Sequence, residues 1–114
     1  MNYFLLAWVL LGAPLACRAQ AAVPTTYEFL TLLESESQAS GLAKIVFAPA
    51  FQGKNEVPLE SLPNVISKNY LATHRQNLET VNRQLEAITA AGWELVHVST
   101  DERAHEYLFR RRKP

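Results

Sequence analysis

The chain has 114 residues, of which 48% are hydrophobic and 19% are charged, and this fits one globular domain and excludes a second. Eleven basic and eleven acidic side chains give a formal net charge of zero, so the composition does not indicate a polyanionic partner such as a nucleic acid. The chain contains one cysteine, which excludes an internal disulfide.

The chain opens on an apolar stretch that is typical of an export signal. Residues 1–11 carry no charged side chain, and Gly12 and Pro14 interrupt the stretch before it reaches the roughly 20 apolar residues of a membrane span. Ala19-Gln20-Ala21 has the small-x-small pattern that signal peptidase accepts. We therefore predict that residues 1–21 are a cleaved export signal and that residues 22–114 form one mature domain with no transmembrane segment.

Cys17 lies inside this leader and permits a different processing route. The order Leu15-Ala16-Cys17 allows Cys17 to become the acylated first residue of a lipoprotein, although Pro14 stands where such sites usually have an aliphatic residue. The first residues also contain no Lys or Arg, which departs from the usual leader. The expected location is periplasmic or secreted, and a lipid-anchored envelope protein is the alternative.

Two β-strands are predicted after the leader. Residues 27–34 are rich in aromatic, β-branched and leucine side chains and end in a polar, turn-forming stretch at residues 35–41. Residues 44–48 are the second strand, and Pro49 closes it. The connection between the two is compact enough for a hairpin.

Residues 49–73 are predicted to be a long irregular segment. Gly53, Pro58 and Pro63 break any helix or central strand, yet large apolar side chains recur throughout the segment. Disordered linkers are depleted in such side chains, so we expect this segment to pack against the domain.

A single helix is predicted next. Four apolar residues recur at spacings of three, four and three, which places them on one helix stripe: Leu78, Val81, Leu85 and Ile88. Thr73 is the expected N-cap. Gly92 is expected to end the helix in a left-handed conformation, after which Trp93 folds back on the last turn.

The chain closes with a predicted antiparallel hairpin. Residues 93–100 and 105–112 are its strands, around a turn at residues 101–104. A symmetric turn pairs Thr100 with His105, Val98 with Tyr107, Val96 with Phe109, and Glu94 with Arg111. Both faces of this hairpin are partly apolar, so we expect either the 49–73 segment or a second copy of the chain to cover one of them.

The predicted fold class is therefore α+β: a mainly antiparallel four-stranded sheet with one helix on a face, in the order β-β-α-β-β. A core of this size buries only about 60–65% of the unfolded chain's surface, which leaves a domain without disulfides marginally stable. Homodimerisation would add to its stability.

No group of residues has the spacing of a catalytic, cofactor or metal site. The three histidines, His74, His97 and His105, show no ligand spacing, and the predicted register puts His97 and His105 on opposite faces of the hairpin. Trp93 is expected to close the helix onto the sheet and not to serve as an aromatic ligand platform. The basic run at residues 110–113 is interpreted as a strand end and a solvated tail, so nucleic acid is not an expected partner.

The motif Gly92-Trp93-Glu94-Leu95, placed directly after a single helix, carries a resemblance to a known family. Together with Tyr27-Glu28-Phe29 in a first strand and a closing strand that ends in the basic pair Arg110-Arg111, it resembles the bacterial family of domain of unknown function 4177. The resemblance implies a fold and a bacterial origin but no activity, cofactor or catalytic residue.

These observations predict an exported, non-enzymatic module that binds itself or another envelope protein. The alternative is a small ligand-binding module or an enzyme whose pocket lies under the 49–73 segment, because long ordered loops often carry function. A concave, polar-lined pocket there would favour the alternative, and a dry apolar seam would exclude it.

Overall fold

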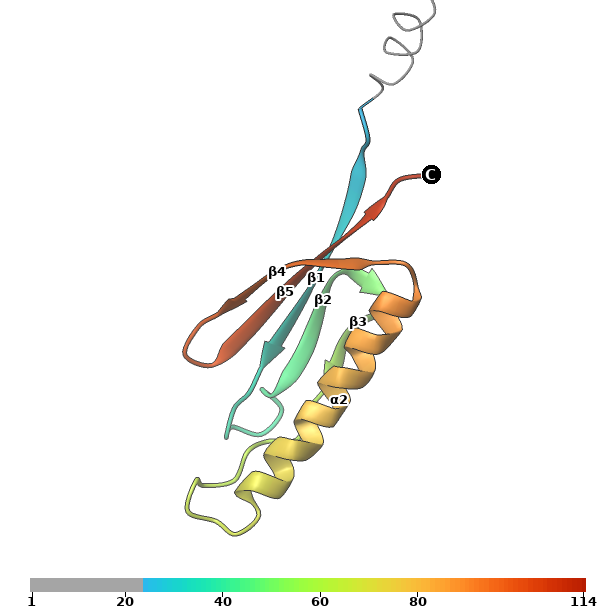
Figure 1. Ribbon diagram of the computed structural model, residues 1–114. Coiled ribbons are helices and arrows are strands. Elements are labelled where there is room, and N and C mark those ends of the chain that lie inside the picture. Colours follow the sequence, from blue (N-terminus) through green and yellow to red (C-terminus); the bar gives the residue numbers. More distant parts are fainter. Residues whose placement is uncertain (1–23) are drawn as a thin grey trace, which may run out of the picture.

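A computed structural model describes residues 24–114, which form one antiparallel sheet with one helix across it (Figure 1). The elements in chain order are β1 (Tyr27–Ser35), β2 (Lys44–Phe51), β3 (Lys54–Pro58), α2 (Tyr70–Ala90), β4 (Glu94–Thr100) and β5 (Ala104–Arg112). The strands lie in the order β3-β2-β1-β5-β4. The α+β class is confirmed, but the sheet has five strands and not the predicted four.

The additional strand, β3, lies within the segment that was expected to be irregular. Phe51 pairs with Lys54 around a two-residue turn in which Gln52 and Gly53 both have positive φ, 52° and 76°. Such turns match the twist of paired strands, so they join β2 and β3 tightly. The segment at 49–73 is therefore partly a hairpin.

Strand β2 also continues through Pro49, which was expected to close it. Proline has no N–H to donate to a ladder, and Pro49 lies where none is needed. The pairing of β2 with β1 ends at Ala48, and the pairing of β2 with β3 is interrupted between Val46 and Phe51.

Helix α2 begins four residues before the position expected from Thr73, with Asn69 at the N-cap and no side-chain cap bond. Its end is as predicted. Gly92 has φ 93°, its N–H donates to Thr89 O (3.1 Å), and the Trp93 N–H donates to Ile88 O (3.3 Å). This pair of bonds is the Schellman motif, in which a left-handed glycine satisfies the last carbonyls of the helix.

The core lies between α2 and one face of the sheet. Alternate residues of β1 point toward the helix, among them Leu30 and Leu32, which are almost fully buried. Side chains from β2, α2 and β5 and from the connection between α2 and β4 complete the core: Ile45, Phe47, Phe51, Val81, Ile88, Phe109 and Trp93. Each large side chain fully buried here contributes about 1.5–3 kcal/mol.

The helix stripe is rotated from the predicted one. Asn77, Val81 and Ile88 are buried, and Leu85 packs partly against the core. Leu78, expected on the buried stripe, is 42% exposed. The buried position next to it is taken by a polar residue, Asn77.

The predicted register of the last hairpin is right near its turn and wrong at its open end. Thr100 faces His105 and Val98 faces Tyr107, as predicted. A bulge between Leu95 and His97 then shifts the register. Because the bulge adds an unpaired residue to β4, Leu95 faces Phe109 in place of Val96, and Glu94 faces Arg110 in place of Arg111.

Within residues 24–114, no helix has the length and apolar character that a membrane span needs. The predicted signal at residues 1–21 and the candidate lipidation site at Cys17 lie outside the described residues.

Candidate functional site

A cleft of about 450 Å³ opens at one end of the sheet, where three connections meet. The loop after β1 contributes residues 36–39, the segment before α2 contributes Leu62 and Val65, and the β4–β5 turn contributes Glu102 and Arg103. Tyr70, the first residue of α2, and His105 of β5 complete the lining. The cleft lies partly beneath the 49–73 segment and has both polar and apolar walls.

Glu34 is the unusual residue behind this cleft. It occupies the inward-facing position of β1 that follows Leu30 and Leu32, and it is only 1% exposed. Its Oε1 atom is buried and has no hydrogen-bond partner among the described residues. Burial raises the pKa of the Glu34 carboxyl, and the neighbouring Glu36 carboxyl raises it further, whereas the nearby His105 and His74 imidazoles act to lower it.

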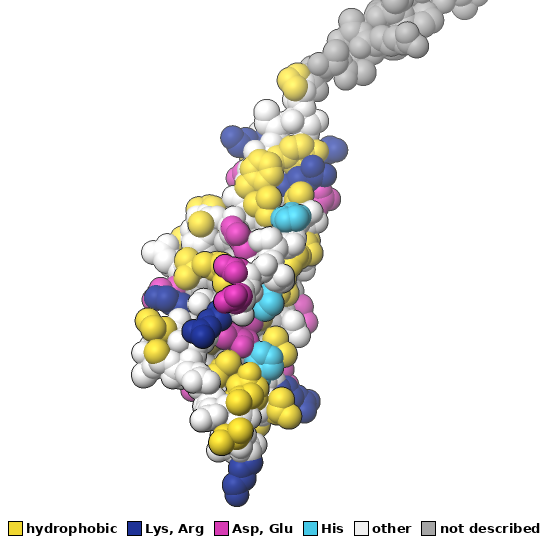
Figure 2. Space-filling model, turned by 90° about the vertical axis from the view of Figure 1, so that its left-hand side faces the viewer, with side chains coloured by type: hydrophobic (Ala, Val, Ile, Leu, Met, Phe, Trp, Pro, Cys, Tyr) yellow, Lys and Arg dark blue, Asp and Glu magenta, His cyan; other side chains and the backbone are white. Residues whose placement is uncertain are grey.

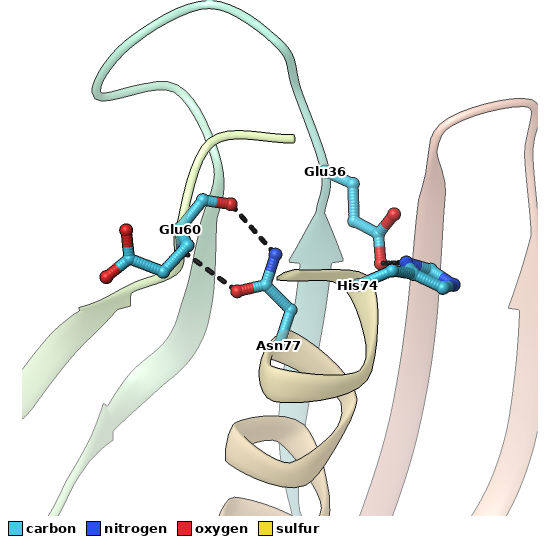
Figure 3. Close-up of polar contacts among 4 residues, drawn as sticks. All are labelled: Glu36, Glu60, His74 and Asn77. Carbon is cyan, nitrogen blue, oxygen red and sulfur yellow. Dashed lines mark hydrogen bonds and ion pairs between the residues drawn. The ribbon is translucent and has the colours of Figure 1, made fainter. Parts of the chain in front are cut away.

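Two carboxyls and two imidazoles therefore gather from three elements of the fold. Glu34 pairs across the ladder with His105 of β5. Glu36, two residues on, lies with Oε1 3.1 Å from Nδ1 of His74 on α2 (Figure 3). We name Glu34, Glu36, His74 and His105 the acid–histidine cluster.

Aromatic side chains border the acid–histidine cluster on two sides. The ring of Tyr70 stacks on the imidazole of His74, with 6.1 Å between the ring centres. Tyr107, next to His105 on the inward face of β5, has its pKa raised by burial and by the charge of Glu34. The cluster thus combines proton-exchanging groups with flat apolar surfaces.

Asn77 holds the 49–73 segment over this region (Figure 3). Its side-chain amide donates to Glu60 O (2.8 Å), and its side-chain oxygen accepts from the Glu60 N–H (2.9 Å). The Leu62 N–H also donates to Ser37 O (2.9 Å). These bonds fix the segment to α2 and to the loop after β1, so the wall of the cleft is tied to the domain, in agreement with the expectation that the segment packs against it.

The residues of the motif at 92–95 lie at the end of the sheet opposite to the cleft and have a structural role. Trp93 is buried, and the guanidinium of Arg111 covers its ring at 4.3 Å from the ring centre. Arg111 also donates to Glu28 (2.7 Å), and Arg110 donates to Glu94. Half of the basic run at residues 110–113 is therefore engaged within the domain, and Trp93 offers no free ring face of the kind a ligand platform needs.

The histidines are distributed as the register implies. His97 faces Leu108, so it lies on the sheet face opposite to His105. Among the described residues, no three His, Cys, Asp or Glu side chains converge as they would around a metal ion.

The acid–histidine cluster was not predicted, because its members are far apart in the sequence. One signal for part of it was present. The inward positions of β1 alternate as Leu30, Leu32 and Glu34, which places a carboxyl where the pattern calls for an apolar side chain.

A second feature is the exposed edge strand β4. All seven of its residues are exposed, and its apolar side chains Leu95, Val96 and Val98 are 50%, 45% and 43% exposed. Figure 2 views the side of the molecule that carries the β4–β5 hairpin, and hydrophobic side chains (yellow) lie in the open there among acidic residues and histidines.

Searches of family models, of curated proteins and of solved structures found no match to this chain. The resemblance to domain of unknown function 4177 therefore stays a prediction from the sequence motif.

Proposed function

We propose that this protein is an exported, non-enzymatic binding module that associates with a second copy of itself through β4. The observation that carries the proposal is the outer edge of β4, where apolar side chains are exposed on a strand that pairs only with β5 in the described sheet. The export part rests on the leader motif at residues 1–21. Cleavage after Ala21 is compatible with the fold, because β1 begins only at Tyr27.

The backbone of β4 indicates that the partner is another strand. The Asp101 N–H donates to Ala104 O (2.8 Å), so these two residues are a hydrogen-bonded pair. Along an antiparallel ladder, every second residue of a strand belongs to such a pair, and the residues between them point their N–H and C=O groups to the other side. Ser99 and His97 therefore bond toward β5, whereas the N–H and C=O groups of Val98 and Thr100 point away from the sheet. An added strand would satisfy these groups.

The two edges of the sheet differ in a way that supports pairing at β4. The β3 edge is short and carries Lys54, Glu56 and Pro58, which are typical protections against strand addition. Between Glu94 and Asp101, β4 has no ionised Lys, Arg, Asp or Glu and no proline. Apart from the bulge between Leu95 and His97, this edge has none of the usual protections, and apolar edges without them favour association.

Over residues 96–100, a second copy fits this edge without opposing like charges. A two-fold axis pairs β4 with itself in antiparallel fashion, as closed dimers require. With the axis at Val98, the two Val98 side chains face each other and Val96 faces Thr100 of the second copy. These are β-branched pairs, which stabilise antiparallel strands by roughly 0.2–1 kcal/mol each. The one acidic residue of the strand, Glu94, is already bonded to Arg110.

Sedimentation equilibrium of the purified protein tests the proposal. We expect a concentration-dependent dimer, and Val98→Lys should abolish it because two ammonium groups would meet at the axis. Ile66→Lys is the matched control, since Ile66 is 88% exposed and lies in the segment before α2, outside β4. A strict monomer, or a dimer that Val98→Lys leaves intact, would exclude association through β4.

The cleft supports a second candidate function, that of a small-ligand-binding module. The cleft is concave, has polar walls and lies partly beneath the 49–73 segment. A ligand-binding module needs such an open, polar-lined cleft, whereas a sealed apolar seam at this place would exclude it. Its volume lies within the range of about 300–1,000 Å³ that ligand sites occupy.

A further inference from the structure

We propose that the cleft beside the acid–histidine cluster binds a small protonated amine with an apolar body. The ammonium group would lie against Glu36, and the apolar body would lie against Tyr70, Leu62 and Val65. This inference is independent of pairing through β4, because the cleft and the β4 edge share no residue that either proposal uses.

Among the carboxylates that form ion pairs in the described residues, Glu36 differs from the other four in its partner. Glu28 and Glu94 each bond to an arginine, Glu79 pairs with Arg75, and Glu56 pairs with Lys44. These four partners are permanently charged. The ion-pair partner of Glu36 among the described residues is His74, which carries a charge only when protonated.

Glu36 is therefore a carboxylate whose ion-pair partner is a histidine and not a lysine or an arginine. Its side chain is only 18% exposed, so solvent compensates its charge poorly. A ligand cation would supply the missing partner. Within the cleft lining, Glu102 adds a second acidic side chain.

Glu34 provides a second observation, because it places another carboxyl behind the wall that carries Glu36. The Glu34 carboxyl is buried, interacts with Glu36 and leaves one oxygen without a partner. Burial and the neighbouring Glu36 both raise the pKa of the Glu34 carboxyl. Two carboxyls close together at the cleft wall favour a cation in front of them.

The rest of the lining suits an organic cation better than a hydrated metal ion. Tyr70 presents an aromatic ring, and Leu62 and Val65 present aliphatic side chains. Aromatic rings attract cations across their faces, by about 0.5–1 kcal/mol at exposed sites. Arg103, the cation of the lining, lies on the β4–β5 turn and forms no ion pair among the described residues.

Other ionisable groups surround Glu36. They are Glu34 on β1, His74 on α2 and His105 on β5, with Glu102 and Arg103 on the turn.

A titration followed by protein NMR tests the site with three matched probes. Phenethylamine, phenethyl alcohol and phenylacetate share an aromatic body and differ in charge. We expect phenethylamine at pH 8 to shift the resonances of Glu36, Tyr70 and His105, and the neutral and anionic probes to bind at least tenfold more weakly. A tenfold change corresponds to about 1.4 kcal/mol, a reasonable value for one partly buried charge pair.

Variants separate the cluster from non-specific attraction. Glu36→Gln should weaken phenethylamine binding about tenfold, whereas Glu106→Gln, an exposed carboxyl on β5, should leave it unchanged. A lysine-containing peptide in place of phenethylamine distinguishes a free amine from a protein side chain as the source of the cation. Equal binding of phenylacetate, no binding of any probe, or no effect of Glu36→Gln would each overturn the proposal.

Discussion

Replacement of the buried carboxyl, Glu34→Leu, should stabilise the domain. Glu34 lies at 1% exposure on the core face of β1, and its Oε1 atom has no hydrogen-bond partner among the described residues. A buried polar group without a partner costs about 1–3 kcal/mol. We expect Glu34→Leu to raise the free energy of unfolding by about this amount at pH 8. In a domain of this size, each kcal/mol corresponds to roughly 4–8 °C in the melting temperature.

The gain in stability from Glu34→Leu should depend on pH, and the pKa of Glu34 determines whether it grows or shrinks as the pH rises. Burial raises this pKa in the folded state above its ordinary value of 4.5. A raised pKa means that the folded protein binds the proton more tightly than the unfolded chain does. The contribution of Glu34 to stability is therefore fully present below the ordinary value and is lost as the pH rises through the folded-state value. The advantage of Glu34→Leu over the natural protein should be small at pH 4.5 and larger at pH 8.

Urea denaturation at both pH values measures this difference directly. Glu34→Gln keeps the shape of the side chain but cannot ionise, so it should remove the pH-dependent part alone. Glu106→Gln, an exposed carboxyl of β5, is the control for a general effect of charge. If Glu34→Leu were less stable than the natural protein at pH 8, or if its advantage did not grow with pH, the description of Glu34 as an uncompensated buried group would be refuted.

Two further substitutions test how the cleft wall and the helix end are held. Asn77→Ala removes two hydrogen bonds to the backbone of Glu60, which together contribute about 1–3 kcal/mol to the free energy of unfolding. Urea denaturation should show this loss of stability, and hydrogen exchange should be faster at the amide of Leu62. Asn82→Ala, at an exposed position of α2, is the control. Unchanged exchange at Leu62 would show that Asn77 does not hold the segment. Gly92→Ala should lower the free energy of unfolding by roughly 1–2 kcal/mol, because a residue with a side chain is strained at φ 93°. A steric clash is not the cause, since the atom nearest to an added Cβ is Arg111 Cδ at 3.7 Å. An unchanged melting temperature would contradict this account of the helix end.

The predictable parts of the fold are those that local sequence determines. Gly92 and Trp93 form the helix end expected from their order, because the left-handed position and the following large side chain are adjacent in the chain. The register at Thr100 and Val98 follows from the short turn alone. Each of these features depends on residues a few positions apart.

The errors arise where tertiary contacts decide the structure. Residues 54–56 are polar and show no strand pattern, and they become β3 because the turn at Gln52 and Gly53 brings them against β2. The bulge in β4 could not be placed, since Leu95, Val96 and Val98 make both faces of the strand apolar and the alternation gives no register. Helix α2 starts at Tyr70 and not after Thr73, because its N-cap is Asn69, an equally good capping residue type whose side chain makes no capping bond here.

The candidate site was still less predictable. Glu36, His74 and His105 come together because β1, α2 and β5 pack at one end of the sheet, and no spacing along the chain reports that proximity. Only Glu34, an acidic residue that follows Leu30 and Leu32 on one face of β1, could be recognised from the sequence alone.

Amide hydrogen exchange along β4, measured in dilute and in concentrated solution, tests the central claim most directly. Pairing with a second copy predicts that the amides of Val98 and Thr100, which point away from the sheet, gain protection as the concentration rises. The amides of His97 and Ser99 already bond toward β5 and should change little. Equal exchange of Val98 and Thr100 at both concentrations, or new protection at β3 in place of β4, would contradict association through this edge.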